Sequence, residues 1–142
     1  NIGAHKNERV KETIKKSIYF GSILGTVIFI AIVIFKEEII GIFTNDATLL
    51  AQTPDAMLIA FLVTPIVTLQ LIGSAYFQAA GKALPALILT LLKQGIFLIP
   101  LAYILPIYYG VDGVWWSFPI ADTLATIITV FVLKREVHKN LK

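Results

Sequence analysis

The sequence contains no cysteine and carries little charge for its length. Without cysteine the chain can form no disulfide and no thiolate metal site. Charged residues make up 15% of the chain, whereas a water-soluble domain carries roughly a quarter. Hydrophobic residues supply 57%. This balance argues against an ordinary soluble domain and predicts an all-α integral membrane protein.

The sequence also lacks the patterns that accompany catalysis. His5 and His138 lie in charged flanks, and no metal-ligand spacing, phosphate-binding glycine loop or nucleophile arrangement is present. We therefore expect no enzymatic activity and no cofactor. The net charge of +3 gives no reason to expect nucleic-acid binding, because the basic residues flank apolar runs. No signal peptide precedes the first run, and we expect a fragment that begins at Asn1 without its N-terminal part.

Long apolar runs dominate the chain, each near the roughly 20 residues with which a helix crosses the hydrocarbon core. These predict four transmembrane helices, between a basic lead-in at 1–16 and a tail at 134–142, over residues 17–35, 56–80, 84–109 and 114–133. A helix start is expected just before the second run, with Thr53 as its cap and Pro54 in its first turn. Pro65, Pro100, Pro106 and Pro119 are expected bend points.

The basic residues gather at one end of the predicted spans. The lead-in, the connection after the second span and the tail hold Lys6, Arg9, Lys11, Lys15, Lys16, Lys82, Lys134, Arg135, Lys139 and Lys142. The opposite connections hold Lys36 among several acids. Because Lys and Arg accumulate on the cytoplasmic side of short loops, both ends are predicted to be cytoplasmic, in a bacterial cytoplasmic membrane. An outer aromatic belt is expected at Tyr108, Tyr109, Trp115 and Trp116.

One acid lies inside the fourth predicted span. Asp122 is separated from Lys134 by about 18 Å of helix, which places it near mid-membrane, and Thr126 and Thr129 follow on the same face. Ionisable groups in a span cost free energy and usually face a bundle interior or a watery cavity. Asp122 is therefore either a carboxylate that takes up a proton or a cation, or a structural acid paired between helices.

A lysine lies inside the third predicted span. Lys93 is about 13 Å from the cytoplasmic end of that span, so its side chain can approach the depth of Asp122 in the adjacent helix. The sequence therefore allows a compensating ion pair. Alternatively, the Lys93 ammonium extends to the inner membrane interface.

Other polar residues recur at helical spacing. On the second span Gln70, Ser74 and Gln78 share one face. On the third span Lys93 and Gln94 share another. With Thr126 these groups either line a substrate path or make hydrogen bonds between packed helices. Packing is favoured for Thr64 and Thr68. Gly21 and Gly25 form a small-xxx-small pair that predicts a close helix contact.

Three stretches carry a family resemblance, namely "NIGAHKNERVKETIKKS", "GSAYFQAAGKALPALILTLLKQGIFLIPLAYILP" and "GVDGVWWSFPIADTLATIITVFVLKRE". The first resembles the connection into an odd-numbered helix of the multidrug and toxic compound extrusion (MATE) family. The second resembles the tenth and eleventh helices of that family, and the third resembles the twelfth. On this mapping the chain holds helices nine to twelve, and the earlier helices of the same transporter are its expected partners.

The resemblance implies a twelve-helix fold of two six-helix lobes around a cavity that opens alternately to either side. It implies expulsion of small amphipathic, often cationic compounds against proton or sodium entry. Asp122 is similar to an acid common in the twelfth helix, and Gln70 to a recurrent polar site on the tenth. The NorM branch carries an acid at the position of Val67, so the cation site of that branch is not implied here.

Two other functions fit parts of the sequence. A lipid-linked oligosaccharide flippase of related architecture would need cationic cavity residues, for which Lys93 is the interior candidate. A small four-span protein acting as an oligomeric channel or scaffold is the second alternative, although no selectivity-filter pattern supports it.

Overall fold

The computed structural model describes residues 1–141, and within them it contains helices and no strand. The elements in chain order are α1 (Asn7–Phe43), α2 (Ala47–Phe61), α3 (Thr64–Ala79), α4 (Ala83–Leu91), the π-helix η1 (Leu92–Leu98), α5 (Ile99–Tyr109) and α6 (Val111–Asn140). The predicted all-α class is therefore confirmed. Lys142, which the charge pattern places in the tail, lies outside the described residues.

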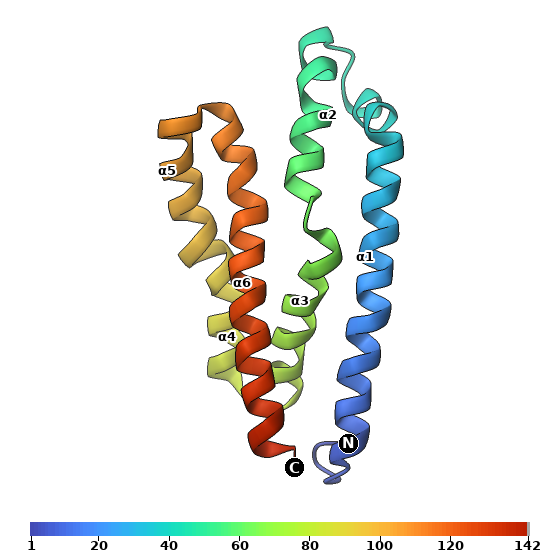
Figure 1. The fold of residues 1–142 in the computed structure, drawn as a ribbon, viewed down its shortest axis with the longest axis vertical. Coiled ribbons are helices and arrows are strands. Elements are labelled where there is room, and N and C mark those ends of the chain that lie inside the picture. The colour runs from blue at the N-terminus through green and yellow to red at the C-terminus, as the bar shows by residue number, and fades with distance from the viewer. Residues whose placement is uncertain (142) are drawn as a thin grey trace.

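The helices form two antiparallel pairs that bring both termini to the same end (Figure 1). α1 packs against α2 and α3, while α4, η1 and α5 form one long path that returns along α6. Three stretches are long and apolar enough to cross a membrane, at Asn7–Phe43, Ala83–Tyr109 and Val111–Asn140. α2 and α3 together form a fourth stretch that is bent by 46°.

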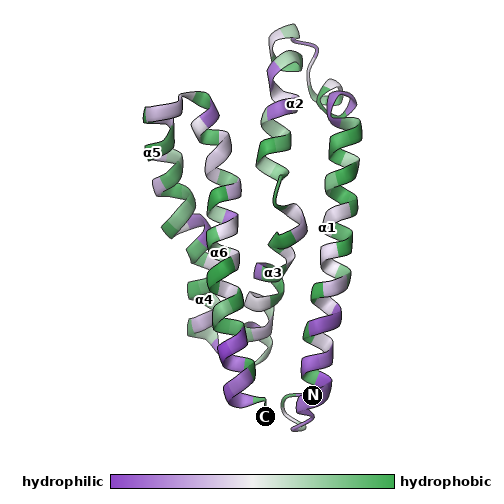
Figure 2. Cartoon of the chain, viewed as in Figure 1, coloured by the Kyte–Doolittle hydropathy of each residue, from purple (hydrophilic) through white to green (hydrophobic). Residues whose placement is uncertain are grey.

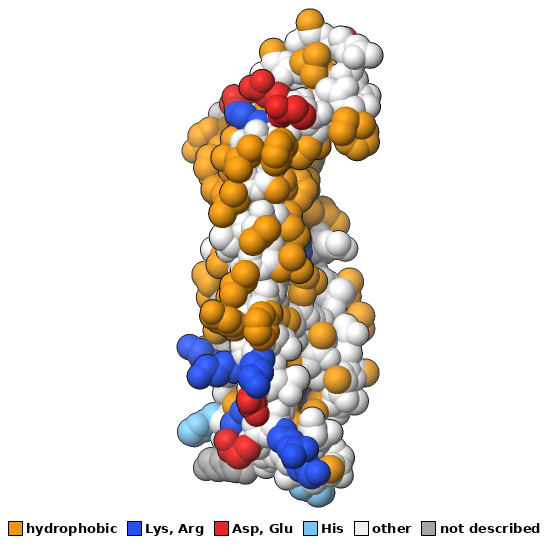
Figure 3. Space-filling view, turned by 90° about the vertical axis from the view of Figure 1, so that its right-hand side faces the viewer, with side chains coloured by type: hydrophobic (Ala, Val, Ile, Leu, Met, Phe, Trp, Pro, Cys, Tyr) orange, Lys and Arg blue, Asp and Glu red, His pale blue; other side chains and the backbone are white. Residues whose placement is uncertain are grey.

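The surface has an apolar belt between charged ends. Hydropathy colouring shows hydrophilic residues at the ends of α1 and α6 near the termini and hydrophobic residues along their middle parts (Figure 2). On the face that α1 dominates, basic side chains lie below the belt and an acidic cluster lies above it (Figure 3). Phe20 and Leu24 in this belt are 64% and 61% exposed. An apolar surface of this extent fits contact with lipid or with further helices.

The second predicted span begins at a different residue from the one expected. The prediction that Thr53 caps this helix is wrong, because α2 starts at Ala47 and Pro54 lies inside it. Asp46 is the cap, and its carboxylate accepts hydrogen bonds from the amides of Thr48 at 2.8 Å and Leu49 at 3.2 Å. A charged acceptor that satisfies two free amides stabilises this earlier start.

Helices α1 and α6 also extend beyond their apolar runs. The lead-in and tail are helical from Asn7 and up to Asn140. Ion pairs one turn apart support the start of α1, from Lys11 to Glu8 and from Lys16 to Glu12, each at 2.7 Å. Such pairs stabilise a helix where hydropathy alone gives no signal.

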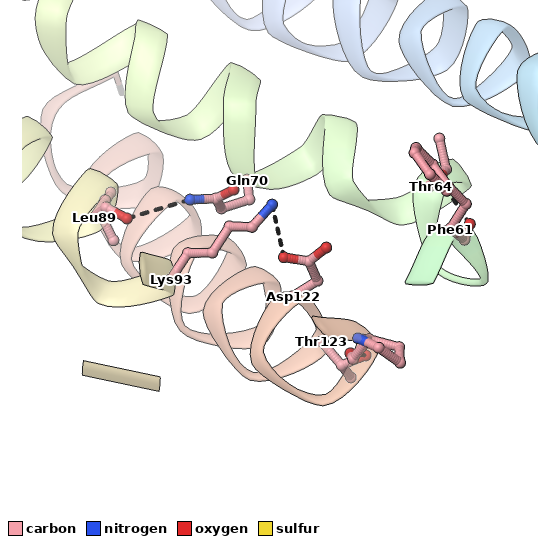
Figure 4. Close-up of polar contacts among 8 residues, drawn as sticks. Phe61, Thr64, Gln70, Leu89, Lys93, Asp122 and Thr123 are labelled. Atoms are coloured by element: carbon pink, nitrogen blue, oxygen red, sulfur yellow. Dashed lines mark hydrogen bonds and ion pairs between the residues drawn. The ribbon is translucent and has the colours of Figure 1, made fainter. Parts of the chain in front are cut away.

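The bend between α2 and α3 falls at Leu62 and Val63, just before Pro65. Proline has no amide hydrogen, so the carbonyl of Phe61 loses its usual donor. The hydroxyl of Thr64 donates to that carbonyl at 2.7 Å in its place (Figure 4). A Cβ atom at Gly25 of α1 would lie 2.8 Å from the carbonyl oxygen of Thr64, so the small-xxx-small pair makes the predicted close contact at this bend.

The third span is continuous but changes its helical form. η1 is a π-helix that ends two residues before Pro100, and the amide of Ile99 donates to the carbonyl of Gln94, five residues earlier. This wider turn suits a position where Pro100 cannot continue the ordinary α-helical ladder. α5 then ends at Gly110, whose positive φ of 60° makes the tight reversal into α6.

The best-buried cluster lies at the end that carries both termini. Phe77 and Leu89 are 1% and 2% exposed, and they pack with Val10, Leu133 and Leu141. Lys82 at the start of α4 forms an ion pair with Glu136 of α6 beside this cluster. The basic ends of the helices are thereby held together.

Candidate functional site

Two opposite charges meet in the middle of the bundle. The Nζ atom of Lys93 in η1 lies 2.8 Å from Oδ1 of Asp122 in α6. The side chains are 27% and 10% exposed, respectively. Gln70 of α3 lies next to them, so residues from three helical segments converge here (Figure 4). The ion pair that the sequence allowed is therefore present, and the alternative extension of Lys93 to the interface is not adopted.

Small buried residues surround Asp122 on α6, and η1 packs against this helix. Ala121 and Ala125, on either side of Asp122, are fully buried, and Ser117 one turn earlier is also fully buried. The extended Lys93 side chain then reaches Asp122 across the interface.

The ion pair leaves hydrogen-bonding capacity unused. Although Nζ of Lys93 is close, it lies off the hydrogen-bond direction, so Oδ1 of Asp122 has no hydrogen-bond donor among the described residues. The hydroxyl oxygen of Thr126, one turn further along α6, also lacks a partner in the described chain. Buried polar atoms without partners are costly, and they often mark a bound water, ion or proton. The Thr126 hydroxyl is therefore a buried polar group for which a water, an ion or a proton acceptor would supply a partner.

Gln70 and Ser74 connect α3 to α4. The amide of Gln70 donates to the carbonyl of Leu89 at 3.3 Å, and the hydroxyls of Ser74 and Thr90 lie 2.9 Å apart. Both Gln70 and Ser74 are buried. The sequence allowed these two residues either to line a substrate path or to hydrogen-bond between helices. In this structure they make hydrogen bonds between helices.

Gln78 and Gln94 do not join the site. Gln78 is exposed, and its amide lies 3.5 Å from the hydroxyl of Ser74. Gln94 is exposed on η1, beside Lys93 in sequence but away from the buried face. Of the residues proposed from the sequence, Asp122, Gln70, Ser74 and Thr126 are buried and Lys93 is partly buried, whereas Gln78 and Gln94 are exposed.

One close contact between α3 and α6 near the site was not among the sequence predictions. A Cβ atom at Gly73 of α3 would lie 2.2 Å from Cγ2 of Thr129 on α6, and Thr129 is fully buried. α3 and α6 therefore approach so closely here that only glycine fits. Gly73 follows Gln70 within one helical turn, and glycine inside an apolar helix was the available signal.

The described helices define an all-helical fragment with three or four stretches long and apolar enough to cross a membrane. The family model described as MatE matches residues 1–104, so this chain belongs to the MatE family. This confirms the family that the sequence resembled; the match covers the first stretch and most of the second, and the third stretch lies beyond residue 104.

Curated relatives and a solved structure are also similar to this chain. "Multidrug export protein MepA" of Staphylococcus aureus (strain bovine RF122 / ET3-1) is 25% identical over 125 residues, covering 88% of this chain and 28% of that protein. The protein of the same name from Staphylococcus saprophyticus is 26% identical over 129 residues, covering 89% of this chain and 28% of that protein. A solved structure described as "protein A" superposes with a TM-score of 0.89 at 40% identity, over 99% of this chain and 31% of that chain. The chain thus spans less than a third of the length of these proteins.

Proposed function

We propose that this chain is the part of a multidrug efflux antiporter in which ion entry is sensed by Asp122. The transporter would expel small amphipathic or cationic compounds across the cytoplasmic membrane in exchange for protons or sodium ions. Relatives named for multidrug export support the direction and the class of substrate. The observation that carries the role of Asp122 is its buried pairing with Lys93 at 2.8 Å.

The physical basis of coupling is the cost of an uncompensated charge between helices. While Asp122 is ionised, attraction to Lys93 holds η1 against α6. When a proton or a sodium ion neutralises Asp122, Lys93 loses its partner, and an unpaired ammonium inside a span is unfavourable. Lys93 then moves toward water, and η1 separates from α6. Ion binding thereby favours a second arrangement of the helices, which is what alternating access requires.

The surroundings of Asp122 support such a response. The Asp122 carboxylate can accept a proton or a sodium ion in exchange for Lys93, and the Thr126 hydroxyl, one turn along α6, is a buried oxygen without a partner among the described residues. η1 lies between α4 and α5, and π-helical turns often occur at functional positions in membrane helices. The proposed orientation keeps both ends of the chain in the cytoplasm, and further helices of the full-length transporter would cover exposed polar side chains such as Gln78 and Gln94.

The flippase alternative receives less support from this arrangement. A pyrophosphate headgroup needs uncompensated positive charge, and Lys93 already faces Asp122. The reading as a small oligomeric channel or scaffold is not supported by membership of the MatE family. We therefore keep export as the proposed activity, and we propose no enzymatic reaction.

Transport by the full-length protein in energised membrane vesicles tests the proposal. Asp122→Asn keeps the shape of the side chain but removes its charge, and we expect it to abolish ion-driven dye export. The matched control is Asp112→Asn, which changes an exposed acid near the start of the same helix and should leave export intact. Imposing a proton gradient and a sodium gradient separately distinguishes the two coupling ions.

If Asp122→Asn left both export and its ion dependence unchanged, Asp122 would not be the residue that senses ion entry. Loss of export in both variants to the same degree would also contradict it, since the effect would then not be specific to the buried acid. Purified yield and monodispersity of each variant separate lost coupling from lost folding.

A further inference from the structure

A groove of about 640 Å³ runs between α1 and α6 at the end of the molecule that carries both termini. Its walls are apolar, with Ile14 and Ile18 on α1 facing Val130 and Leu133 on α6, and Leu69 of α3 completes the lining. The volume falls in the range of sites that hold small organic ligands. The groove is separate from the pair of Lys93 and Asp122, neither of which lines it.

The edges of this groove are basic. Lys11, Lys15, Lys134 and His138 line it, and no acidic residue does. α1 and α6 run in opposite directions, so Lys15 and Lys134 stand at a similar level, where the first apolar run begins and the last one ends. Ile18 and Val130 lie one turn further toward the membrane interior. The groove is thus cationic at the expected interface and apolar beyond it.

The charges of Lys15 and Lys134 are not compensated within the described chain. The nearby acids are paired elsewhere, Glu8 with Lys11, Glu12 with Lys16 and Glu136 with Lys82. Neither Lys15 nor Lys134 forms an ion pair with a described residue, and both are exposed. Two unpaired ammonium groups beside an apolar groove are complementary to a ligand with an anionic head and a hydrocarbon tail.

We propose that this groove binds one anionic phospholipid, with its phosphate between Lys15 and Lys134 and an acyl chain along Ile18, Leu69 and Val130. Basic pockets between helices at the cytoplasmic interface suit anionic headgroups. A further protein helix is the competing occupant that the test below distinguishes, and the two unpaired ammonium groups favour an anionic headgroup over an uncharged one. This inference rests on the proposed orientation of the chain and is independent of the coupling role of Asp122.

The test counts lipids that stay on the full-length protein. Nanodiscs containing phosphatidylcholine with phosphatidylglycerol would supply the lipid, and native mass spectrometry after transfer to detergent would count retained phosphatidylglycerol. In the double variant Lys15→Gln with Lys134→Gln, we expect retention to weaken by roughly thirtyfold, since each lysine near an anionic surface contributes on the order of fivefold.

Two further variants make the result specific. Lys16→Gln with Arg135→Gln removes the same charge at the same level from side chains that do not line the groove, and it should change retention by less than about threefold. Val130→Trp keeps every charge but fills the groove, and it should abolish retention. Dye export measured in parallel reports on coupling separately.

Equal loss in the two double variants would overturn the proposal, because it would show only diffuse attraction to the basic end. Retained lipid in Val130→Trp would place the lipid elsewhere. Absence of retained phosphatidylglycerol on the unaltered protein, with Lys15 protected from amine-reactive labelling, would show that another helix occupies the groove and would equally overturn it.

Discussion

Two of the membrane-length helical paths are interrupted before a proline, at Pro65 between α2 and α3 and at Pro100 after η1. At the first, the chain bends by 46°, and Gly25 of α1 packs against the backbone at Thr64. At the second, the ladder widens into a π-helix, and a Cβ atom at Gly95 would meet nothing within 4 Å. Another helix of the described chain contacts the bend, whereas Gly95 of η1 has no such neighbour within the described chain.

This difference indicates which interruption can move. Displacing the bend would require α1 to withdraw from a backbone contact. Displacing η1 would require the ion pair of Lys93 and Asp122 to open and Leu92 to leave the buried cluster. The proposed coupling acid thus acts on the second interruption and not on the first, and the predictions below test that contrast.

Removing the charge that holds η1 should have the largest effect on stability. Lys93→Met leaves the buried Asp122 carboxylate without its counter-charge, and we expect a loss of about 3 kcal/mol in the free energy of unfolding. Reversible unfolding of the full-length protein in mixed micelles measures it. The double variant with Asp122→Leu should recover most of the loss. Strict additivity of the two changes would mean that the pair contributes no coupling energy.

Adding one methyl group at the clamped bend should have the next largest effect. Gly25→Ala places a Cβ atom 2.8 Å from the carbonyl oxygen of Thr64, and we expect a loss of about 2 kcal/mol from the forced backbone shift. The same unfolding experiment reports it. Gly95→Ala is the matched control in the open segment and should cost nothing. Equal losses in both variants would contradict the contrast between the two interruptions.

Removing the substitute donor at the bend should have a smaller effect. Thr64→Val deletes the hydroxyl that bonds to the carbonyl of Phe61, and we expect a loss of about 1 kcal/mol. Thr26→Val is the control, because its hydroxyl donates to Ser22 within the uninterrupted part of α1. If Thr64→Val left the free energy of unfolding unchanged, water would replace the hydroxyl at the bend.

The smallest expected effect lies outside both interruptions, at the start of α1. A hydrogen bond from Lys16 holds the pKa of the exposed Glu12 carboxyl below its usual range, assisted by the charge of Lys16. A lowered pKa means that this stabilisation is present above the usual pKa and is lost as the pH falls through the lowered value. Lys16→Gln should return the Glu12 pKa to its usual range in an NMR titration. An unchanged titration would show that the pair does not form in solution.

The sequence alone carried much of the architecture. Apolar runs, the absence of charge within them and the gathering of Lys and Arg at one end are local properties, because each residue's transfer cost into lipid depends mainly on its own side chain. The opposite charges of Lys93 and Asp122 were also readable from depth and helical rise. Helix starts set by capping were less accessible, since Asp46 and Thr53 are both plausible caps and only one of them accepts the amides.

Only the tertiary structure decided how the prolines were accommodated and which polar residues face the interior. Pro65 and Pro100 look alike in sequence, yet the first accompanies a bend and the second a π-helix, and the space beside each segment depends on the neighbouring helices. The same holds for Gly73 against Thr129 and for the exposure of Gln78 and Gln94. Hydrophobicity fixes where the chain enters the membrane, but the packing of one helix on another fixes which groups meet inside it.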